Sequence, residues 1–375
     1  MCELFKRFFG KSCDNKNAIE LLEVRDSPPD VRQEYETVSQ LIRSENFESV
    51  SLIVDKLSKS LNKNTTIPNE ISFVVNKEEC FGLLGTNGSG KTTTFRLLTG
   101  DLDLDSGNAY LGSHADLLTN RRQFYSRVGY CPQNDALLDG LTGRQTLVFF
   151  GRIRGVERKA LEKFVSNICV VFELKAILDK RVTTYSGGNR RKLSLAVALI
   201  GRPLVLLLDE PTTGVDPDSR LSIWCLLRDL MVCQKVSIVL TSHNMTECEA
   251  LCSRLAIVSK GVLKAIGFTA HLKSFYAKGF DLIVKVKSDS NEVIVDEVKR
   301  RMNDMFGDNC VEKYDNFGVI YYNLQSVDSR LSQIFQSLNQ LKRELHFEDY
   351  FVSNASLEQA FLHMIATQDT SPSDE

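Results

Sequence analysis

The sequence predicts an α/β protein with a doubly wound parallel sheet, followed by a smaller α+β domain. A glycine-rich stretch at 85–92 lies between an apolar run and an expected helix. Two later apolar runs end in side chains that commonly bind ligands, Asp209-Glu210 and His243, as the strands of such a sheet do at its carboxyl edge. From about Gly279 the expected order becomes β-α-β-β-α-β, which is typical of a ferredoxin-like domain.

The glycine-rich stretch fits the pattern G-x-x-x-x-G-K-[ST] at every fixed position. Its glycines let successive backbone N–H groups and a helix N-terminus point at one anion. The side chain of Lys91 is expected to reach the phosphates of a nucleotide, and the hydroxyl of Thr92 to bind Mg²⁺. The alternative is a glycine-rich turn without a ligand. The residues expected to bind the nucleotide are Gly85, Thr86, Asn87, Gly88, Ser89, Gly90, Lys91, Thr92 and Thr93.

The composition is that of a globular protein. With 375 residues, a net charge of −2 and 43% hydrophobic residues, the chain is long enough for two domains. Its ten cysteines are scattered and are expected to be reduced thiols. No apolar stretch approaches the ~18–20 residues that cross a bilayer. The low net charge, without a basic run, argues against nucleic acid as a partner.

The first 270 residues are expected to form a linker and one domain. Residues 1–48 are mostly polar and predict a linker with a short helix near 31–43; its first nine residues fit either a membrane-surface segment or a disordered terminus. The domain at 49–270 includes a helical subdomain at about 134–191. Its expected strands are 49–57, 66–75, 79–84, 107–111, 127–130, 204–208, 237–241 and 255–258, and its other helices are 91–99, 219–233 and 246–252.

The ferredoxin-like domain is expected at 279–368, with a tail at 369–375. Its predicted strands are 281–287, 310–313, 319–324 and 346–352, and its predicted helices are 292–306, 326–345 and 356–365.

Four polar residues at strand ends are the candidates for chemistry. Asp209 can hold Mg²⁺, and Glu210 can act as a base on a water beside the γ-phosphate, although such a pair is often only a turn or a cap. His243 can contact the γ-phosphate, although a lone histidine is more often structural. Gln133 can contact Mg²⁺ or water. The candidate catalytic residues are Glu210, His243, Gln133 and Lys91, and the candidate metal ligands are Thr92, Gln133 and Asp209.

A second anion-binding turn is predicted at 185–189, Tyr185-Ser186-Gly187-Gly188-Asn189. Ser186 is expected to cap a helix whose first N–H groups the two glycines expose. One chain does not need two such sites, so this turn is expected to serve a nucleotide held by another copy or domain. An ordinary helix start is the alternative, and the following Arg190–Lys192 run also fits a solvated helix face.

Together these motifs resemble the ATP-binding cassette (ABC) family, whose ATPase domain is a P-loop NTPase with a helical subdomain. The motifs that match in the family's order are the phosphate loop 85–92, the glutamine loop at Gln133, the signature loop 185–189, the Asp209-Glu210 strand end, the turn Gly214-Val215-Asp216 and His243. The wording Tyr-Ser-Gly-Gly-Asn-Arg-Arg-Lys at 185–192 and Leu-Thr-Gly-Arg at 141–144 is similar to subfamily A, the large lipid exporters. Segments 346–350 and 356–361 resemble the C-terminal regulatory domain of that subfamily, and 30–32 resembles the linker into its second nucleotide-binding domain.

The resemblance implies two ATPase domains that meet head to tail, with ATP and Mg²⁺ between the phosphate loop of one and the signature loop of the other. Asp216 then lies in a turn that contacts the second nucleotide-binding domain, supplied in cis or in trans. ATP hydrolysis drives transmembrane domains, and Gln133 couples to them. The chain is then membrane-associated on the cytoplasmic face of a membrane, as a fragment or as a separate subunit.

Two positions depart from the family pattern. Leu61 stands where the family usually stacks an aromatic ring on adenine, which predicts weaker nucleotide binding. Gln145 stands where the subfamily often has Glu. Two other functions remain open: a soluble ABC ATPase that uses ATP-driven dimerisation as an assembly switch, and a nucleotide-binding module that does not hydrolyse.

Overall fold

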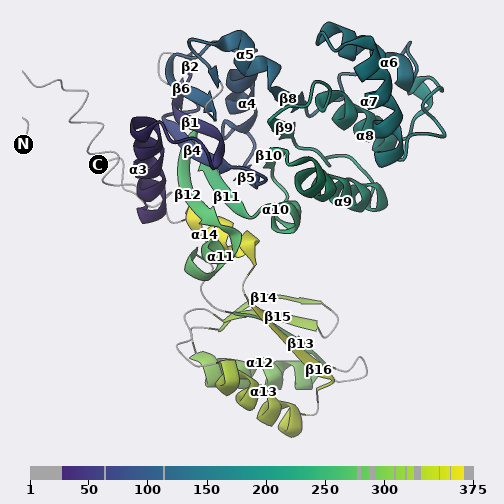
Figure 1. Cartoon of the computed structure of the whole chain (residues 1–375). Helices are drawn as coiled ribbons and strands as arrows, with labels where there is room; N and C mark the ends of the chain where they lie inside the picture. Colours follow the sequence, from purple (N-terminus) through teal and green to yellow (C-terminus); the bar gives the residue numbers. More distant parts are fainter. Residues whose placement is uncertain are drawn as a thin grey trace, which may run out of the picture. The chain divides into compact units, whose positions relative to one another are not determined.

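The computed structural model describes residues 28–62, 65–112, 115–276, 280–286, 292–307, 310–316, 319–324, 331–345, 347–354 and 356–366. The chain divides into two compact units, Met1–Phe268 and Thr269–Glu375 (Figure 1). The predictions for the first nine residues, for the start of the helix at 326–345 and for the tail at 369–375 lie outside the described residues.

The first unit is built on a six-stranded sheet in the order β12-β11-β5-β10-β9-β8. All neighbours are parallel except the β11–β12 hairpin. Leu206, Leu207 and Leu208 are all buried, as expected for a strand inside a parallel sheet. The strands are β5 (Cys80–Gly85), β8 (Val128–Cys131), β9 (Val205–Asp209), β10 (Ser237–Ser242), β11 (Arg254–Ser259) and β12 (Val262–Phe268). The prediction of an α/β fold with a parallel sheet is confirmed.

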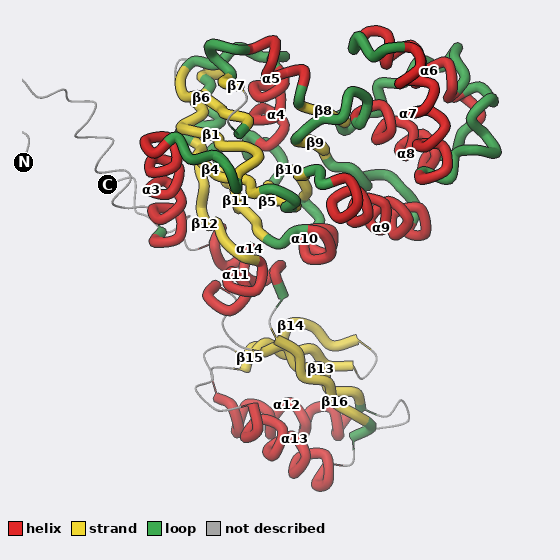
Figure 2. Tube along the Cα trace, viewed as in Figure 1, coloured by secondary structure: helices red, strands yellow, loops and turns green. Residues whose placement is uncertain are grey.

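A separate antiparallel sheet in the order β4-β1-β6-β7 accompanies the parallel one (Figure 2). The expected pairing of the first two strands is present between β1 (Val50–Ser58) and β4 (Ile71–Asn76). The strand pattern of the sequence does not distinguish this sheet from the parallel one. The two share a hydrophobic core, in which the rings of Phe73 and Phe81 stack 5.0 Å apart. The remaining strands are β2 (Ser60–Asn62), β3 (Thr65–Thr66), β6 (Ser106–Leu111) and β7 (Ala115–Asp116).

The helices expected at 91–99, 219–233 and 246–252 are present in this unit, whereas the helix at Arg121–Ser126 was not expected. The helix α3 (Pro29–Ser44) lies in the segment expected as a linker and contacts β4 and β12. The others outside the helical subdomain are α4 (Lys91–Thr99), α5 (Arg121–Ser126), α9 (Pro217–Gln234) and α10 (Met245–Leu251).

The helical subdomain contains α6 (Gly143–Ile153), α7 (Arg158–Val171), the 3₁₀ turn η1 (Val182–Thr184) and α8 (Gly187–Ala198). Helix α8 continues seven residues beyond the expected end at 191. Thr142 caps α6 in a capping box with Gln145, whose side chain accepts from the backbone N–H of Thr142 at 2.9 Å. Glu and Gln both fill this position of a capping box, so the side chain of Gln145 keeps the bond that a Glu would make.

The second unit has the ferredoxin-like order that the sequence predicts. Its sheet runs β14-β15-β13-β16, and α12 and α13 lie on the same face of it (Figure 2). The helices α11 and α14 contact each other. The elements are α11 (Thr269–Tyr276), β13 (Phe280–Lys285), α12 (Glu292–Phe306), β14 (Cys310–Asn316), β15 (Val319–Leu324), α13 (Leu331–Leu345), β16 (Asp349–Asn354) and α14 (Leu357–Ala366). Among the described residues of the whole chain, no helix combines the length and the apolar character needed to span a membrane.

Candidate functional site

The candidate site lies at the carboxyl edge of the parallel sheet. The strands β5, β10, β9 and β8 are parallel neighbours, so their carboxyl ends meet at one edge. The phosphate loop follows β5, Asp209 ends β9, His243 follows β10 and Gln133 follows β8. The structure therefore brings together the four segments that carry the candidate catalytic residues.

The phosphate loop joins β5 to α4 in a shape that requires glycine at position 90. The backbone of Gly90 has a φ of 103°, and a Cβ there would lie 2.7 Å from Cγ2 of Ile67. The ammonium group of Lys91 donates to the carbonyl oxygens of Gly85 at 2.8 Å and Thr86 at 2.9 Å. Burial lowers the pKa of Lys91, and the negative charges of Glu210 and Asp209 oppose that shift.

Thr92 and Asp209 fit a Mg²⁺ ion. The hydroxyl of Thr92 donates to Oδ1 of Asp209 at 3.2 Å, and the hydroxyl of Thr241 donates to the same oxygen at 2.5 Å. Hydroxyl and carboxylate oxygens side by side are ligands that this ion prefers. Nε2 of Gln133, the third expected ligand, donates to the carboxylate of Glu210 at 2.9 Å.

The carboxylate of Glu210 is the centre of the site. It accepts from Nε2 of Gln133 at 2.9 Å and from the hydroxyl of Thr213 at 3.1 Å, and Nδ1 of His243 lies 3.1 Å from its other oxygen. The backbone of Glu210 has a φ of 44°, a conformation that costs a non-glycine residue about 1–3 kcal/mol. The N–H of Glu210 donates to the carbonyl and the hydroxyl oxygens of Thr241, which hold the strained turn in place.

A buried carboxylate that was not expected from the sequence lies next to this site. Glu247 on α10 is 2% exposed. It accepts from the hydroxyls of Thr212 and Ser242, both at 2.7 Å, and from Nε1 of Trp224 at 3.4 Å. It therefore links the turn after Glu210 to the residue before His243. No motif marks Glu247, but its spacing before the buried Leu251 places it on the inner face of a short helix.

The signature loop leads into helix α8, and its two glycines differ in how closely other residues approach them. A Cβ on Gly188 would lie 2.3 Å from Oγ of Ser219, so glycine is required there. Gly187 has no heavy atom within 4 Å of such a Cβ, which leaves its backbone accessible. Ser186 caps the helix by accepting from the N–H of Asn189 at 3.4 Å, as expected.

Tyr185 at the start of this loop and Asp216 in the later turn have structural contacts. The hydroxyl of Tyr185 donates to the carbonyl of Ile177 at 2.7 Å, and burial raises the pKa of Tyr185. Asp216 caps α9 by accepting from the N–H of Ser219 at 3.0 Å, and this bond lowers the pKa of Asp216.

A hollow of about 400 Å³ adjoins the phosphate loop. Oγ of Ser89 is buried there without a hydrogen-bond partner among the described residues, which suits an anion as ligand. The lining contains no aromatic ring, and Leu61 is not part of it. Leu61 lies on β2, beside the lining strand β3, with half of its surface exposed. The lining residues are Thr65, Thr66, Ile67, Thr86, Asn87, Gly88, Ser89 and Lys260.

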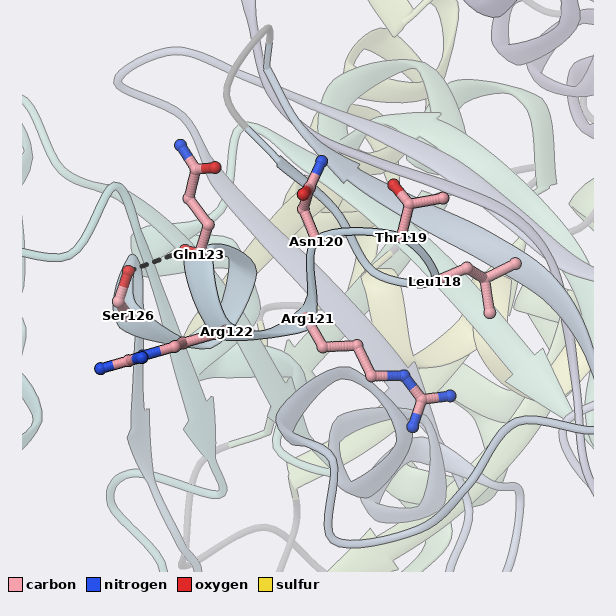
Figure 3. A pocket seen from close by; sticks show the side chains of 7 residues that line it. All are labelled: Leu118, Thr119, Asn120, Arg121, Arg122, Gln123 and Ser126. Atoms are coloured by element: carbon pink, nitrogen blue, oxygen red, sulfur yellow. Dashed lines mark hydrogen bonds between the residues drawn. The ribbon is translucent and has the colours of Figure 1, made fainter.

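A larger hollow of about 650 Å³ is separate from this site. One continuous segment, 118–126, supplies its lining. Figure 3 shows that the side chains of Arg121 and Arg122 point in different directions, so they do not converge on one ligand. None of the predicted site residues contributes to this hollow.

Leu61 gives a testable prediction about nucleotide affinity. Stacking of a base on an aromatic side chain contributes roughly 1–3 kcal/mol, so Leu61→Tyr is expected to lower the Kd for ATP severalfold in equilibrium binding measurements. Leu118→Tyr is the matched control, because Leu118 is a similarly exposed leucine far along the chain from the phosphate loop. An unchanged Kd for Leu61→Tyr would show that this position does not face the adenine.

Comparisons with known families match both units. The family described as "ABC transporter" matches residues 68–213, and the family described as "ABCA1-like, C-terminal R1 regulatory domain" matches residues 277–354. The chain is 42% identical over 313 residues to the phospholipid-transporting ATPase ABCA3 of Rattus norvegicus, which covers 83% of this chain and 18% of that protein. It is 43% identical over 290 residues to ATP-binding cassette sub-family A member 2 of Homo sapiens, and this match covers 77% of this chain and 12% of that protein.

Solved structures share the fold. CbiO1 of Clostridium perfringens, part of the ABC transporter complex cbiONQ, has a TM-score of 0.56 at 22% identity, covering 69% of this chain and 96% of that one. An ATP-binding subunit of an ABC transporter has a TM-score of 0.55 at 22% identity, and this match covers 60% of this chain and 93% of that one. At this identity the likeness supports the fold alone.

Proposed function

The chain belongs to the ABC transporter family, and we propose that it binds and hydrolyses ATP to power transmembrane transport. The observation that carries the proposal is the position of the Glu210 carboxylate, which contacts Gln133 and His243. The preceding residue, Asp209, accepts a hydrogen bond from Thr92. A carboxylate so placed beside a bound triphosphate can take the proton of an attacking water.

Each residue of the site has a role in this proposal. Lys91 exchanges its two backbone carbonyl partners for phosphate oxygens, which brings its charge to the nucleotide. Thr92 and Asp209 hold Mg²⁺, which neutralises phosphate charge when bound. Glu210 accepts the proton of water, Gln133 orients that carboxylate, and His243 stabilises charge at the γ-phosphate.

The nucleotide site is completed by a second nucleotide-binding domain in this proposal. Gly187 leaves open backbone at the N-terminus of α8, where a helix favours an anion. The partner domain contributes this loop to the ATP on the phosphate loop, and the turn at Asp216 contacts the partner.

Transport and location rest on the relatives. The chain spans less than a fifth of the length of the curated relatives described above. The relative ABCA3 is named as a phospholipid-transporting ATPase, and we propose lipids as the cargo for this chain as well. Transmembrane domains are the proposed partners, and the cytoplasmic face of a membrane is the proposed location.

Cysteine crosslinking tests the shared site. Ser89→Cys and Gly187→Cys are combined with Glu210→Gln to block hydrolysis, and the exposed Cys225 and Cys233 are first replaced by Ser. Oxidation with saturating ATP and Mg²⁺ is expected to give a covalent dimer on a non-reducing gel, and ADP is expected to give none.

The control moves the second cysteine to Gly140→Cys. Gly140 also lies in open space in the helical subdomain but outside the signature loop, so no dimer is expected from this pair. If the pair at 89 and 187 never crosslinks in ATP, two copies of this chain do not share their nucleotides in the proposed way.

A further inference from the structure

Arg191 lies on the second turn of α8 and is almost completely buried, with 3% of its surface exposed. Its guanidinium donates to two separate loops. Toward the glutamine loop, Nη1 donates to the carbonyls of Pro132 at 2.6 Å and Gln133 at 3.2 Å and to the carboxylate of Asp135 at 3.1 Å.

Toward the turn after β9, the same guanidinium bonds three successive backbone carbonyls. Nη2 donates to Asp209 at 2.9 Å and Glu210 at 3.2 Å, and Nε donates to Pro211 at 2.7 Å. One planar group of fixed shape therefore sets the spacing between the backbone of Gln133 and the backbone of Glu210. Hydrogen bonds from a charged donor in a buried site are strong. The ammonium group of a lysine carries its donors on one atom and cannot make all of the bonds of Arg191 at once.

The neighbours of Arg191 on α8 have other partners. Arg190 pairs with Asp139 at 3.0 Å, and Lys192 pairs with Glu173 at 2.8 Å. Of these three basic residues, Arg191 is the one whose described bonds reach both catalytic loops. The Arg190–Lys192 run is therefore more than the solvated helix face that its sequence also fits.

We propose that Arg191 is a positioning residue, which fixes Gln133 and Glu210 relative to the signature helix; this rests on the proposed ATPase activity. Arg191 follows Ser186 by five residues, about 7.5 Å along one rigid helix. In the proposed dimer, the signature loop contacts the ATP held by the other domain. A displacement of this loop by that ATP therefore moves Arg191, which bonds the backbone of Glu210 in this chain's own site. Positioning by Arg191 predicts a specific kinetic signature.

The test is Arg191→Lys in the purified chain, with Arg190→Lys as the matched control on the preceding residue. Lysine keeps the charge beside Asp135 but cannot bridge both loops, and a displaced catalytic group lowers kcat by about 10- to 100-fold. The Kd for ATP is expected to stay near that of the parent, because Arg191 makes no described bond to the phosphate loop. Arg190→Lys is expected to leave both values unchanged.

A double-variant cycle separates positioning from general damage. If Arg191 acts through the carboxylate of Glu210, Arg191→Lys has little further effect on single-turnover hydrolysis in a Glu210→Gln background. Multiplicative losses in the double variant, or a parent-like kcat for Arg191→Lys, would overturn the inference. Failure of the parent chain itself to bind and hydrolyse ATP would instead overturn the proposed function.

Discussion

Replacing Glu210 with Gln is expected to lower kcat for ATP hydrolysis by about 10²- to 10⁴-fold, which is the usual contribution of a general base. The amide keeps the shape of the side chain, so its oxygen can still accept from Gln133 and from Thr213. It cannot accept the proton of an attacking water. ATP binding is expected to remain, because the contacts of Lys91 and Thr92 do not involve the side chain of Glu210. Phosphate release and equilibrium binding of ATP measure the two effects separately.

Two controls make this prediction specific. Glu249→Gln removes the same charge from an exposed position on α10, and its hydrolysis rate is expected to equal that of the parent. Lys91→Ala removes the cation of the phosphate loop and is expected to weaken ATP binding itself. A Glu210→Gln variant that releases phosphate at the parental rate would show that this carboxylate is not the base.

The meeting of the candidate residues at the carboxyl edge of the parallel sheet was predictable from a simple geometric rule. Parallel neighbours end at one edge, so polar residues after apolar runs must meet there, and Asp209, Glu210, His243 and Gln133 do so. The particular pairing was not predictable. Nothing in the sequence indicates that the amide of Gln133 donates to the carboxylate of Glu210, and its expected contact with Mg²⁺ or water stays a prediction. The chemical roles of these residues remain predictions.

Arg191 and Glu247 were missed for a different reason. Basic and acidic residues on helices usually face water, and only packing against distant segments decides otherwise. The partners of Arg191 lie near positions 132–135 and 209–211, which are far from it in the sequence. The separate antiparallel sheet was missed likewise, because the pairing of β6 with β1 depends on long-range register. Local motifs indicated the chemistry, whereas long-range packing determined these contacts.

A buried ion pair is expected to hold helix α3 to the rest of the first unit. Glu34 accepts from Nη2 of Arg254 at 2.7 Å and from the N–H of Val74 at 2.9 Å. Arg254 also donates to the carbonyl of Val74 at 3.0 Å and lies 3.7 Å from the carboxylate of Glu79. Both side chains of the Glu34–Arg254 pair are about nine-tenths buried, so neither charge can be rehydrated cheaply if its partner is lost.

Arg254→Met is therefore expected to lower the free energy of unfolding of the first unit by about 3–5 kcal/mol, because it leaves buried carboxylates without their cation. Urea unfolding followed by the fluorescence of Trp224 measures this, since the chain has a single tryptophan and it lies on α9 of that unit. Arg158→Met breaks an exposed pair with Glu162 and is expected to cost only about 0.3–0.5 kcal/mol.

The double variant Glu34→Leu/Arg254→Met tests whether the loss comes from the unpaired charge. Removing both charges is expected to recover part of the stability that Arg254→Met loses, because apolar side chains of similar size can replace a buried pair with little cost. The carboxylate of Glu79 still lacks Arg254 in this variant, so recovery is expected to be incomplete. If the double variant is no more stable than Arg254→Met, the loss does not come from the unpaired charge of Glu34.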